Sequence, residues 1–138
     1  MEYQITYTTT IDSGYAGKLS YFEASRDVPF EIKRIYYIHG VPSGSQRGGH
    51  AHRCLRQILF CPYGTIEIVL DDGKNREHIM LDEPSKGLVI GPGLWREMIW
   101  HQDNSVLCVA ASEYYDEMDY IRDYSAFLQY VNEEKQHD

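Results

Sequence analysis

No stretch of this 138-residue chain approaches the about 20 consecutive apolar residues that a membrane-spanning helix needs. The first residues, Met-Glu-Tyr-Gln, lack the basic and then apolar pattern of a secretion signal. Basic residues are outnumbered, 13 against 21 acidic ones, and the net charge of −8 disfavours a general nucleic-acid binder. These absences predict a cytoplasmic protein with neither a membrane nor a nucleic acid as partner. They leave room for a nucleotide ligand, because a few arginines can hold a diphosphate inside an acidic protein.

Cysteine is also scarce: Cys54, Cys61 and Cys108 are odd in number and form no C-x-x-C pair. Cys61 and Cys108 lie in apolar segments, which favours buried free thiols over a disulfide. No repeat, low-complexity tract or linker interrupts the chain, and its length is that of one domain. We therefore predict a single domain over residues 1–138.

Short β-branched and aromatic runs recur along the chain, separated by Gly, Pro, Asp and Asn. This spacing is typical of an all-β sandwich or barrel rather than of β-α-β units. The Asp-Asp-Gly-Lys sequence at 71–74 predicts a hairpin turn. After Ser112 the pattern changes, and residues 116–131 carry apolar residues spaced three and four apart. It predicts one C-terminal α-helix over 116–132, followed by a tail at 133–138.

The most informative stretch lies at residues 44–64 and contains His50, His52 and Gln57 between two glycines. Its spacing resembles the first signature of the cupin superfamily, which implies a small jelly-roll β-barrel. Strand alternation places His50 and His52 on one face, and in a small barrel that face can be the interior. Metal-binding cupins have a glutamate where this chain has Gln57.

The second cupin signature is only partly present, and Arg96 stands where metal-binding members place their third histidine. An arginine cannot deprotonate to bind a divalent ion. Two histidines without further ligands make a weak metal site. The pair can be a merely structural polar patch, but the flanking Arg47-Gly48-Gly49 favours function, since glycines allow close backbone approach and arginine clamps diphosphates. We therefore predict acid/base histidines, with no metal and no cofactor.

Five blocks in order resemble the dTDP-4-keto-6-deoxyglucose 3,4-ketoisomerases. They are PFEIKRIYYI at 29–38, RGGHAHR at 47–53, LDDG at 70–73, WREM at 95–98 and ASEYYD at 111–116. The resemblance implies movement of a ketone from C4 to C3 of a dTDP-linked 6-deoxyhexose, for bacterial surface glycans such as S-layers and O-antigens. It also implies metal-free histidine catalysis as in RmlC-type epimerases, and a homodimer that exchanges an N-terminal strand at residues 1–10.

Moving a ketone by one carbon requires a base at C3, stabilisation of an enediol oxyanion and proton delivery to C4. Histidine suits this work because its unperturbed pKa is about 6.5. By the resemblance, His50 is the principal base, and His52 is the second acid/base or orients the sugar. Tyr37 and Arg47 are the expected partners of the oxyanion. Tyr36 and Tyr37 point to opposite faces of a strand, and we prefer Tyr37, although both can be packing residues.

Further residues are expected to bind the substrate. Lys33, Arg34, Arg53 and Arg56 are candidates for the diphosphate, and Arg34 and Arg47 are preferred. Gln57 belongs to the same pocket, and Trp95 can stack on the thymine or the sugar.

This chain departs from some relatives at two positions. Arg96 replaces a histidine in a Trp-His-Glu-Met block, and Tyr15 replaces an arginine. We expect both to contact substrate and to favour a gluco-configured 3-keto product over the galacto one. A 3,5-epimerase with the same base and a non-catalytic sugar-nucleotide-binding cupin are the alternatives.

Overall fold

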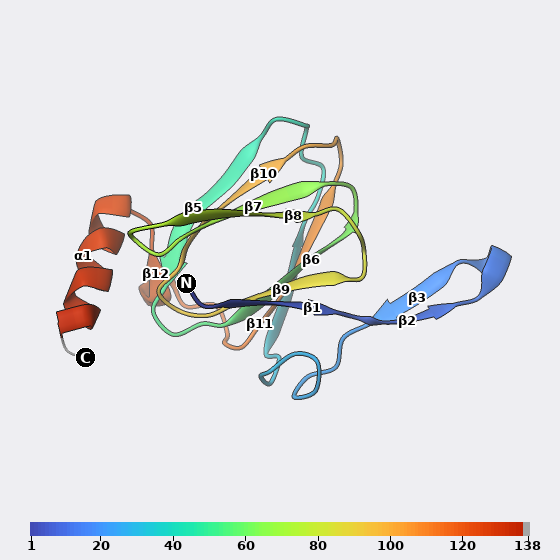
Figure 1. Ribbon diagram of the computed structural model, residues 1–138, viewed down its shortest axis with the longest axis horizontal. Helices are drawn as coiled ribbons and strands as arrows, with labels where there is room; N and C mark the ends of the chain where they lie inside the picture. The colour runs from blue at the N-terminus through green and yellow to red at the C-terminus, as the bar shows by residue number, and fades with distance from the viewer. Residues whose placement is uncertain (137–138) are drawn as a thin grey trace.

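The computed structural model describes residues 1–136 and consists of antiparallel strands followed by one C-terminal helix (Figure 1). Two five-stranded sheets have the orders β1-β9-β6-β11-β4 and β12-β5-β10-β7-β8, and a third, β2-β3, has two strands. The strands are β1 (Tyr3–Tyr7), β2 (Thr9–Asp12), β3 (Lys18–Tyr21), β4 (Arg34–Ile38), β5 (Gln46–His52), β6 (Gln57–Tyr63), β7 (Ile66–Asp71), β8 (Arg76–Leu81), β9 (Lys86–Ile90), β10 (Trp95–Trp100), β11 (Val106–Ala111) and β12 (Tyr120–Ile121). The arrangement confirms the predicted all-β, cupin-type barrel with a C-terminal helix.

The core lies between the two larger sheets and follows from the alternation of side chains along each strand. On β7, Ile66, Ile68 and Leu70 are fully buried in this core, and Leu107 and Val109 of β11 join them. The predicted hairpin at 71–74 connects β7 to β8, which pair antiparallel. Because every second side chain of these strands packs in the core, the direction in which the other side chains point is fixed as well.

Helix α1 covers Tyr124–Gln136, so the predicted start at 116 is wrong. A 3-10 turn, Glu117–Asp119, and the short β12 occupy the first part of the predicted range. The backbone of β12 pairs with the end of β5, which gives it an extended conformation despite the helical spacing of its apolar residues. Asp123 then caps the helix, because its carboxylate accepts from the backbone N–H of Ala126 at 2.9 Å.

The helix continues beyond the predicted end at 132, so residues 133–136 are helical rather than a tail. Residues 137–138 of that predicted tail lie outside the described residues. Within residues 1–136, no helix has the length and apolar character needed to cross a bilayer.

The N-terminal region has two parts. Strand β1 pairs with β9 of the same chain at the edge of the first sheet. Strands β2 and β3 form a hairpin that extends away from the barrel (Figure 1). Exchange of residues 1–10 between subunits stays a prediction.

Candidate active site

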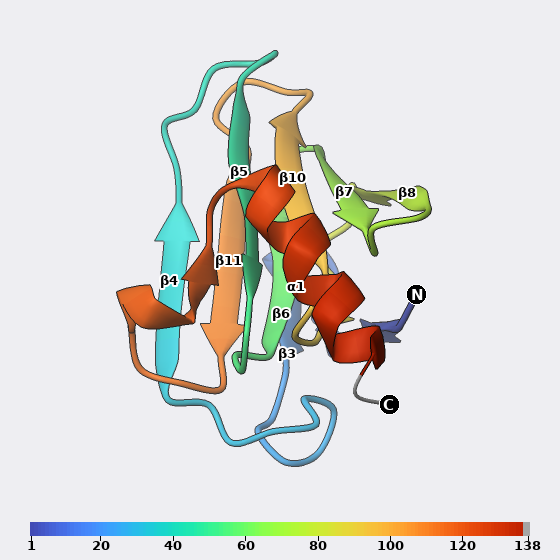
Figure 2. The ribbon, with the colours of Figure 1, turned by 90° about the vertical axis from the view of Figure 1, so that its left-hand side faces the viewer.

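A cavity of about 500 Å³ opens beside β4 and β5. Residues 113–123 pass these strands on their way to α1, as the ribbon in Figure 2 shows. We call these residues the pre-helix segment. The polar lining residues are Arg34 and Tyr36 of β4, Arg47 and His50 of β5, and Tyr115, Tyr120 and Arg122 of the pre-helix segment. Three arginines and no carboxylate of the described chain line this space. It is suited to an anionic ligand.

A β-bulge places His50 in the cavity. Arg96 of β10 pairs with His50, whereas the next residue, Glu97, pairs with Gly48, so Gly49 has no partner. Gly48 has a φ of +89°, and a Cβ there would lie 3.0 Å from the Met98 side chain and 3.1 Å from the Arg96 carbonyl oxygen. The glycines thus allow β5 to approach β10 closely while the bulge directs the imidazole inward.

The environment of His50 favours its neutral form. Burial, followed by the positive charge of Arg96, lowers the pKa of His50 to about 3. Its ring centroid lies 5.1 Å from that of His52, edge to face. A neutral imidazole at the cavity wall can accept a proton.

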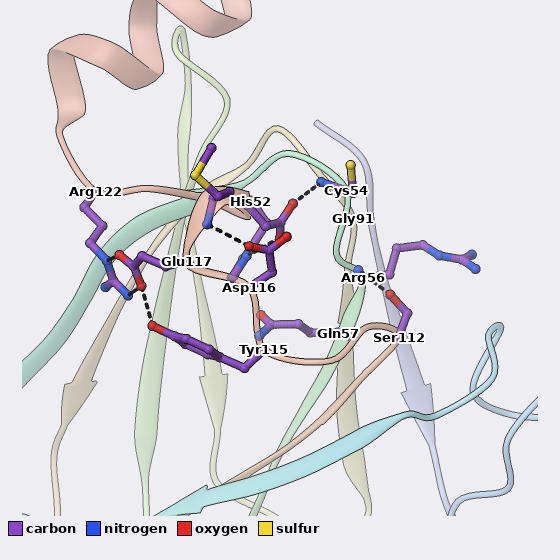
Figure 3. Close-up of polar contacts among 12 residues, drawn as sticks. His52, Cys54, Arg56, Gln57, Gly91, Ser112, Tyr115, Asp116, Glu117 and Arg122 are labelled. Atoms are coloured by element: carbon purple, nitrogen blue, oxygen red, sulfur yellow. Dashed lines mark hydrogen bonds and ion pairs between the residues drawn. The ribbon is translucent and has the colours of Figure 1, made fainter.

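His52 lies deeper, with a fully buried side chain. Its Nδ1 is 2.9 Å from Oδ2 of Asp119, whose Oδ1 accepts from the backbone N–H of Cys54 at 2.7 Å. Nε2 of His52 is buried and has no hydrogen-bond partner among the described residues. Burial and Arg96 lower the pKa of His52, while Asp119 acts in the opposite direction. Figure 3 shows His52 and Cys54 beside each other in this cluster.

Arg96 lies opposite His50 on the neighbouring strand β10 and is completely buried. Its Nη1 donates to Oε1 of Gln57 at 2.6 Å, and its Nε and Nη2 donate to the Leu94 carbonyl at 3.3 and 2.9 Å. Burial lowers the pKa of Arg96 to about 10, which leaves it charged at neutral pH. The interior therefore holds a permanent cation whose hydrogen bonds here go to neutral acceptors.

This arrangement fits a divalent metal poorly. The amide oxygen of Gln57, which replaces the usual carboxylate ligand, is already engaged by Arg96. Arg96 would also repel a metal ion electrostatically. Among residues 1–136, no group of three or more His, Cys, Asp or Glu is placed to hold one.

Tyr36, not Tyr37, faces the cavity. Our preference for Tyr37 as the site residue is therefore wrong. Pairing with β11 sets the alternation: Tyr36 lies opposite the core residue Val109, and Tyr37 opposite Cys108. Tyr37 is 64% exposed and its ring packs near His39 outside the barrel. The hydroxyl of Tyr36 accepts from the amide of Gln57 at 2.9 Å, and burial raises the pKa of Tyr36, so the phenol stays protonated.

Of the predicted diphosphate ligands, Arg34 and Arg47 reach the cavity and Lys33 does not. The guanidinium of Arg34 lies 5.3 Å from the ring centre of Tyr36, and its Nε and Nη2 are buried without a hydrogen-bond partner among the described residues. Lys33 lies outside the cavity, and its Nζ is 3.5 Å from a carboxylate oxygen of Glu113. Arg34 thus has free donors inside the cavity.

Two other predicted substrate residues lie away from the cavity of this chain. Trp95 precedes Arg96 and points to the opposite face of β10, where it packs against Tyr124 and Phe127 of α1. Stacking of Trp95 on the substrate is therefore wrong for this structure. Tyr15 is fully exposed at the tip of the β2–β3 hairpin.

The pre-helix segment supplies residues that sequence reasoning missed, because that range was predicted as regular helix. Arg122 donates from Nε and Nη2 to Glu117 at 2.7 and 2.9 Å, and the Tyr115 hydroxyl also donates to Glu117 (Figure 3). Arg122 lies 4.2 Å from the ring centre of Tyr120. Hydrogen bonds from Arg122 lower the pKa of Glu117 to about 2. Tyr115, Tyr120 and Arg122 of this group line one side of the cavity.

Known proteins resemble this chain over nearly all of its length. The model of the family described as FdtA, WxcM-like, C-terminal, matches residues 1–132. A TDP-4-oxo-6-deoxy-α-D-glucose-3,4-oxoisomerase of Aneurinibacillus thermoaerophilus is 43% identical over 127 residues, 92% of this chain and 90% of that protein.

Solved structures give the same picture. A 3,4-ketoisomerase from Helicobacter canadensis has a TM-score of 0.92 and 44% identity, covering 96% of this chain and 98% of that one. A His-to-Asn variant of the 3,4-ketoisomerase QdtA from Thermoanaerobacterium thermosaccharolyticum, in complex with TDP-4-keto-6-deoxyglucose, has a TM-score of 0.91 and 40% identity, covering 95% and 94%.

Proposed function

This chain belongs to the FdtA, WxcM-like family and is a TDP-sugar 3,4-ketoisomerase, and on that premise we propose how it works and on what. The proposed reaction converts dTDP-4-keto-6-deoxy-D-glucose into the dTDP-linked 3-keto-6-deoxy sugar. The observation that carries the proposal is a cavity lined by arginines, in which the neutral imidazole of His50 lies opposite the buried, charged Arg96 of the neighbouring strand.

The diphosphate is bound by the arginines of the cavity wall. Arg34 has two buried donors without a partner among the described residues, so a phosphate oxygen can satisfy them at no loss of an existing contact. Arg47 lines the same space. A bound diphosphate also adds negative charge near His50, which raises the pKa of His50 and makes it a stronger base.

His50 removes the proton from C3. The C3–H bond breaks, its electron pair forms a C3=C4 double bond, and the carbonyl pair moves to O4. The buried charge of Arg96 stabilises the resulting enediolate electrostatically, and the protonated phenol of Tyr36 can donate to it. The proton lost from O3 passes by way of His52 to O4, the C3 carbonyl forms, and C4 takes the proton that His50 holds. No metal takes part, since Arg96 and Gln57 occupy the positions of two ligands.

The configuration of the product at C4 depends on the groups near that carbon. We propose a gluco product. The support is Arg96, which stands where some relatives have a histidine. Tyr15 joins the site in a homodimer with exchanged N-terminal segments, because the hairpin that carries it extends away from its own barrel (Figure 1).

Two features support the homodimer. Isolated two-stranded hairpins are marginally stable, and Ile11 and Leu19 of this one are 52% and 56% exposed. A hollow of about 780 Å³ between the hairpin and the outer face of the barrel is lined by apolar residues such as Phe22, Ile58 and Phe60. A second copy would cover both surfaces, and light scattering that gave a monomer mass would contradict this. The cytoplasmic location stays a prediction.

Incubation with dTDP-4-keto-6-deoxyglucose in deuterated water, followed by NMR, tests the function. We expect a ketone at C3, an equatorial hydroxyl at C4 after reductive trapping, and no deuterium at C5. A 3,5-epimerase would leave the ketone at C4 and label C3 and C5. A non-catalytic binding protein would label nothing, and an axial C4 hydroxyl would overturn the gluco assignment alone.

A further inference from the structure

Asp119 is the carboxylate that contacts His52. It divides its oxygens between two partners, with Oδ1 toward the backbone N–H of Cys54 and Oδ2 toward Nδ1 of His52. A carboxylate can only accept, so Nδ1 of His52 must carry the hydrogen of this bond. In a neutral imidazole the other nitrogen, Nε2, is then an acceptor.

The surroundings of Nε2 suggest what it accepts. It is buried and has no hydrogen-bond partner among the described residues, and such an atom costs free energy unless a ligand satisfies it. The ring of His52 lies 5.1 Å from that of His50 and 4.4 Å from that of Tyr120, and both of those residues line the cavity. A sugar hydroxyl that enters between them would supply the missing donor.

We propose that Asp119 is a positioning residue that holds His52 in the Nδ1-protonated tautomer, which leaves Nε2 free to accept a proton from the sugar. This inference rests on the proposed ketoisomerase function. The steps balance: one proton travels from C3 to His50 to C4, and another from O3 to Nε2 of His52 to O4. The C3=O3 bond forms as the C3=C4 double bond is lost.

Asp119→Asn separates orientation from chemistry. The amide oxygen can keep the bond from Cys54, but its NH₂ group then faces His52 and must donate to Nδ1. The proton of the imidazole moves to Nε2, which becomes a donor instead of an acceptor. Asp119→Glu keeps a carboxylate and hence the original tautomer. Asp116→Asn is the matched control, because Asp116 caps the neighbouring 3-10 turn through Met118 and an asparagine caps equally well.

Nitrogen-15 NMR of the substrate-free proteins reads the tautomer directly, with the His52 signals assigned by their loss in His52→Gln. We expect a protonated Nδ1 in the wild type and in Asp119→Glu, and a protonated Nε2 in Asp119→Asn. Steady-state kinetics should give a kcat at least about 10²-fold lower for Asp119→Asn with little change in KM. Asp119→Glu should recover part of the loss, and Asp116→Asn should match the wild type.

The results discriminate cleanly. A wild-type His52 protonated on Nε2 overturns the proposal even if Asp119→Asn fails to fold. A folded Asp119→Asn protein with the reversed tautomer and unchanged kcat overturns the role in catalysis. A wild-type enzyme with the expected tautomer that does not move the ketone refutes the proposed function instead.

Discussion

Tyr36 shows that a residue's odd or even position along a strand decides whether its side chain faces the site or the outside of the barrel. Its hydroxyl contacts Gln57, which in turn accepts from Arg96, so the three side chains form a chain of hydrogen bonds beneath the histidines. Tyr37, one position further, is exposed on the outside. Sequence alone could identify the pair, because both are Tyr on a β-rich run, but only the pairing of β4 with β11 decides which one enters the site.

This neighbouring pair provides a matched test. Tyr36→Phe removes the hydroxyl from the cavity and leaves the amide of Gln57 without its acceptor. A lost hydrogen bond of about 1–1.5 kcal/mol corresponds to about a tenfold lower kcat/KM. Tyr37→Phe should leave kcat/KM as in the wild type. Kinetics with the dTDP-keto-sugar check both, and equal effects of the two substitutions would contradict the assignment.

At the scale of the element, β5 carries the site because it is distorted. The bulge at Gly48 and Gly49 shifts the register with β10 and sets His50 opposite Arg96. Gly44, a few residues earlier, also has a positive φ of +88°, but open space surrounds the place of its missing Cβ. The two glycines therefore share a backbone conformation and differ in how closely another strand approaches.

Substitution of each glycine by alanine separates these effects. Gly44→Ala should cost only the strain of a left-handed alanine, about 1 kcal/mol. Gly48→Ala adds contacts of 3.0 Å to Met98 and 3.1 Å to a backbone oxygen, so it should cost about 2–3 kcal/mol and reduce kcat as well. Urea unfolding and kinetics on both variants measure this. If Gly48→Ala were as active and as stable as Gly44→Ala, the close approach would have no role in the site.

Elements were predictable where one pattern dominated. Recurring β-branched and aromatic runs indicated the strands, and Asp-Asp-Gly marked the hairpin between β7 and β8. The structure of the pre-helix segment was not predictable, because its apolar spacing suits a helix while the backbone of β12 pairs with β5. That error concealed Asp119, Tyr120 and Arg122, which enter the site only because β12 brings them beside the end of β5.

For the whole molecule, the buried histidines link stability to pH. The pKa of His50 is lowered to about 3 and that of His52 is also lowered, whereas both rise to about 6.5 in the unfolded chain. The unfolded state therefore binds more protons as the pH falls below about 6.5, and the folded state loses stability there. The lowered pKa of Glu117, about 2, acts in a separate window, below about 4.5.

The free energy of unfolding should thus fall by about 1–3 kcal/mol between pH 7.5 and pH 5.5, since each histidine contributes up to about 1.4 kcal/mol per pH unit. The double variant His50→Asn/His52→Asn should lose most of this slope. His39→Asn removes an exposed imidazole and should keep the slope. Urea unfolding measures the free energy of unfolding of the three proteins. The protein concentration is kept fixed, so that subunit association contributes equally at each pH. A double variant with the wild-type slope would mean that other groups carry the pH dependence, and that the two histidines are not held neutral by burial in the folded barrel.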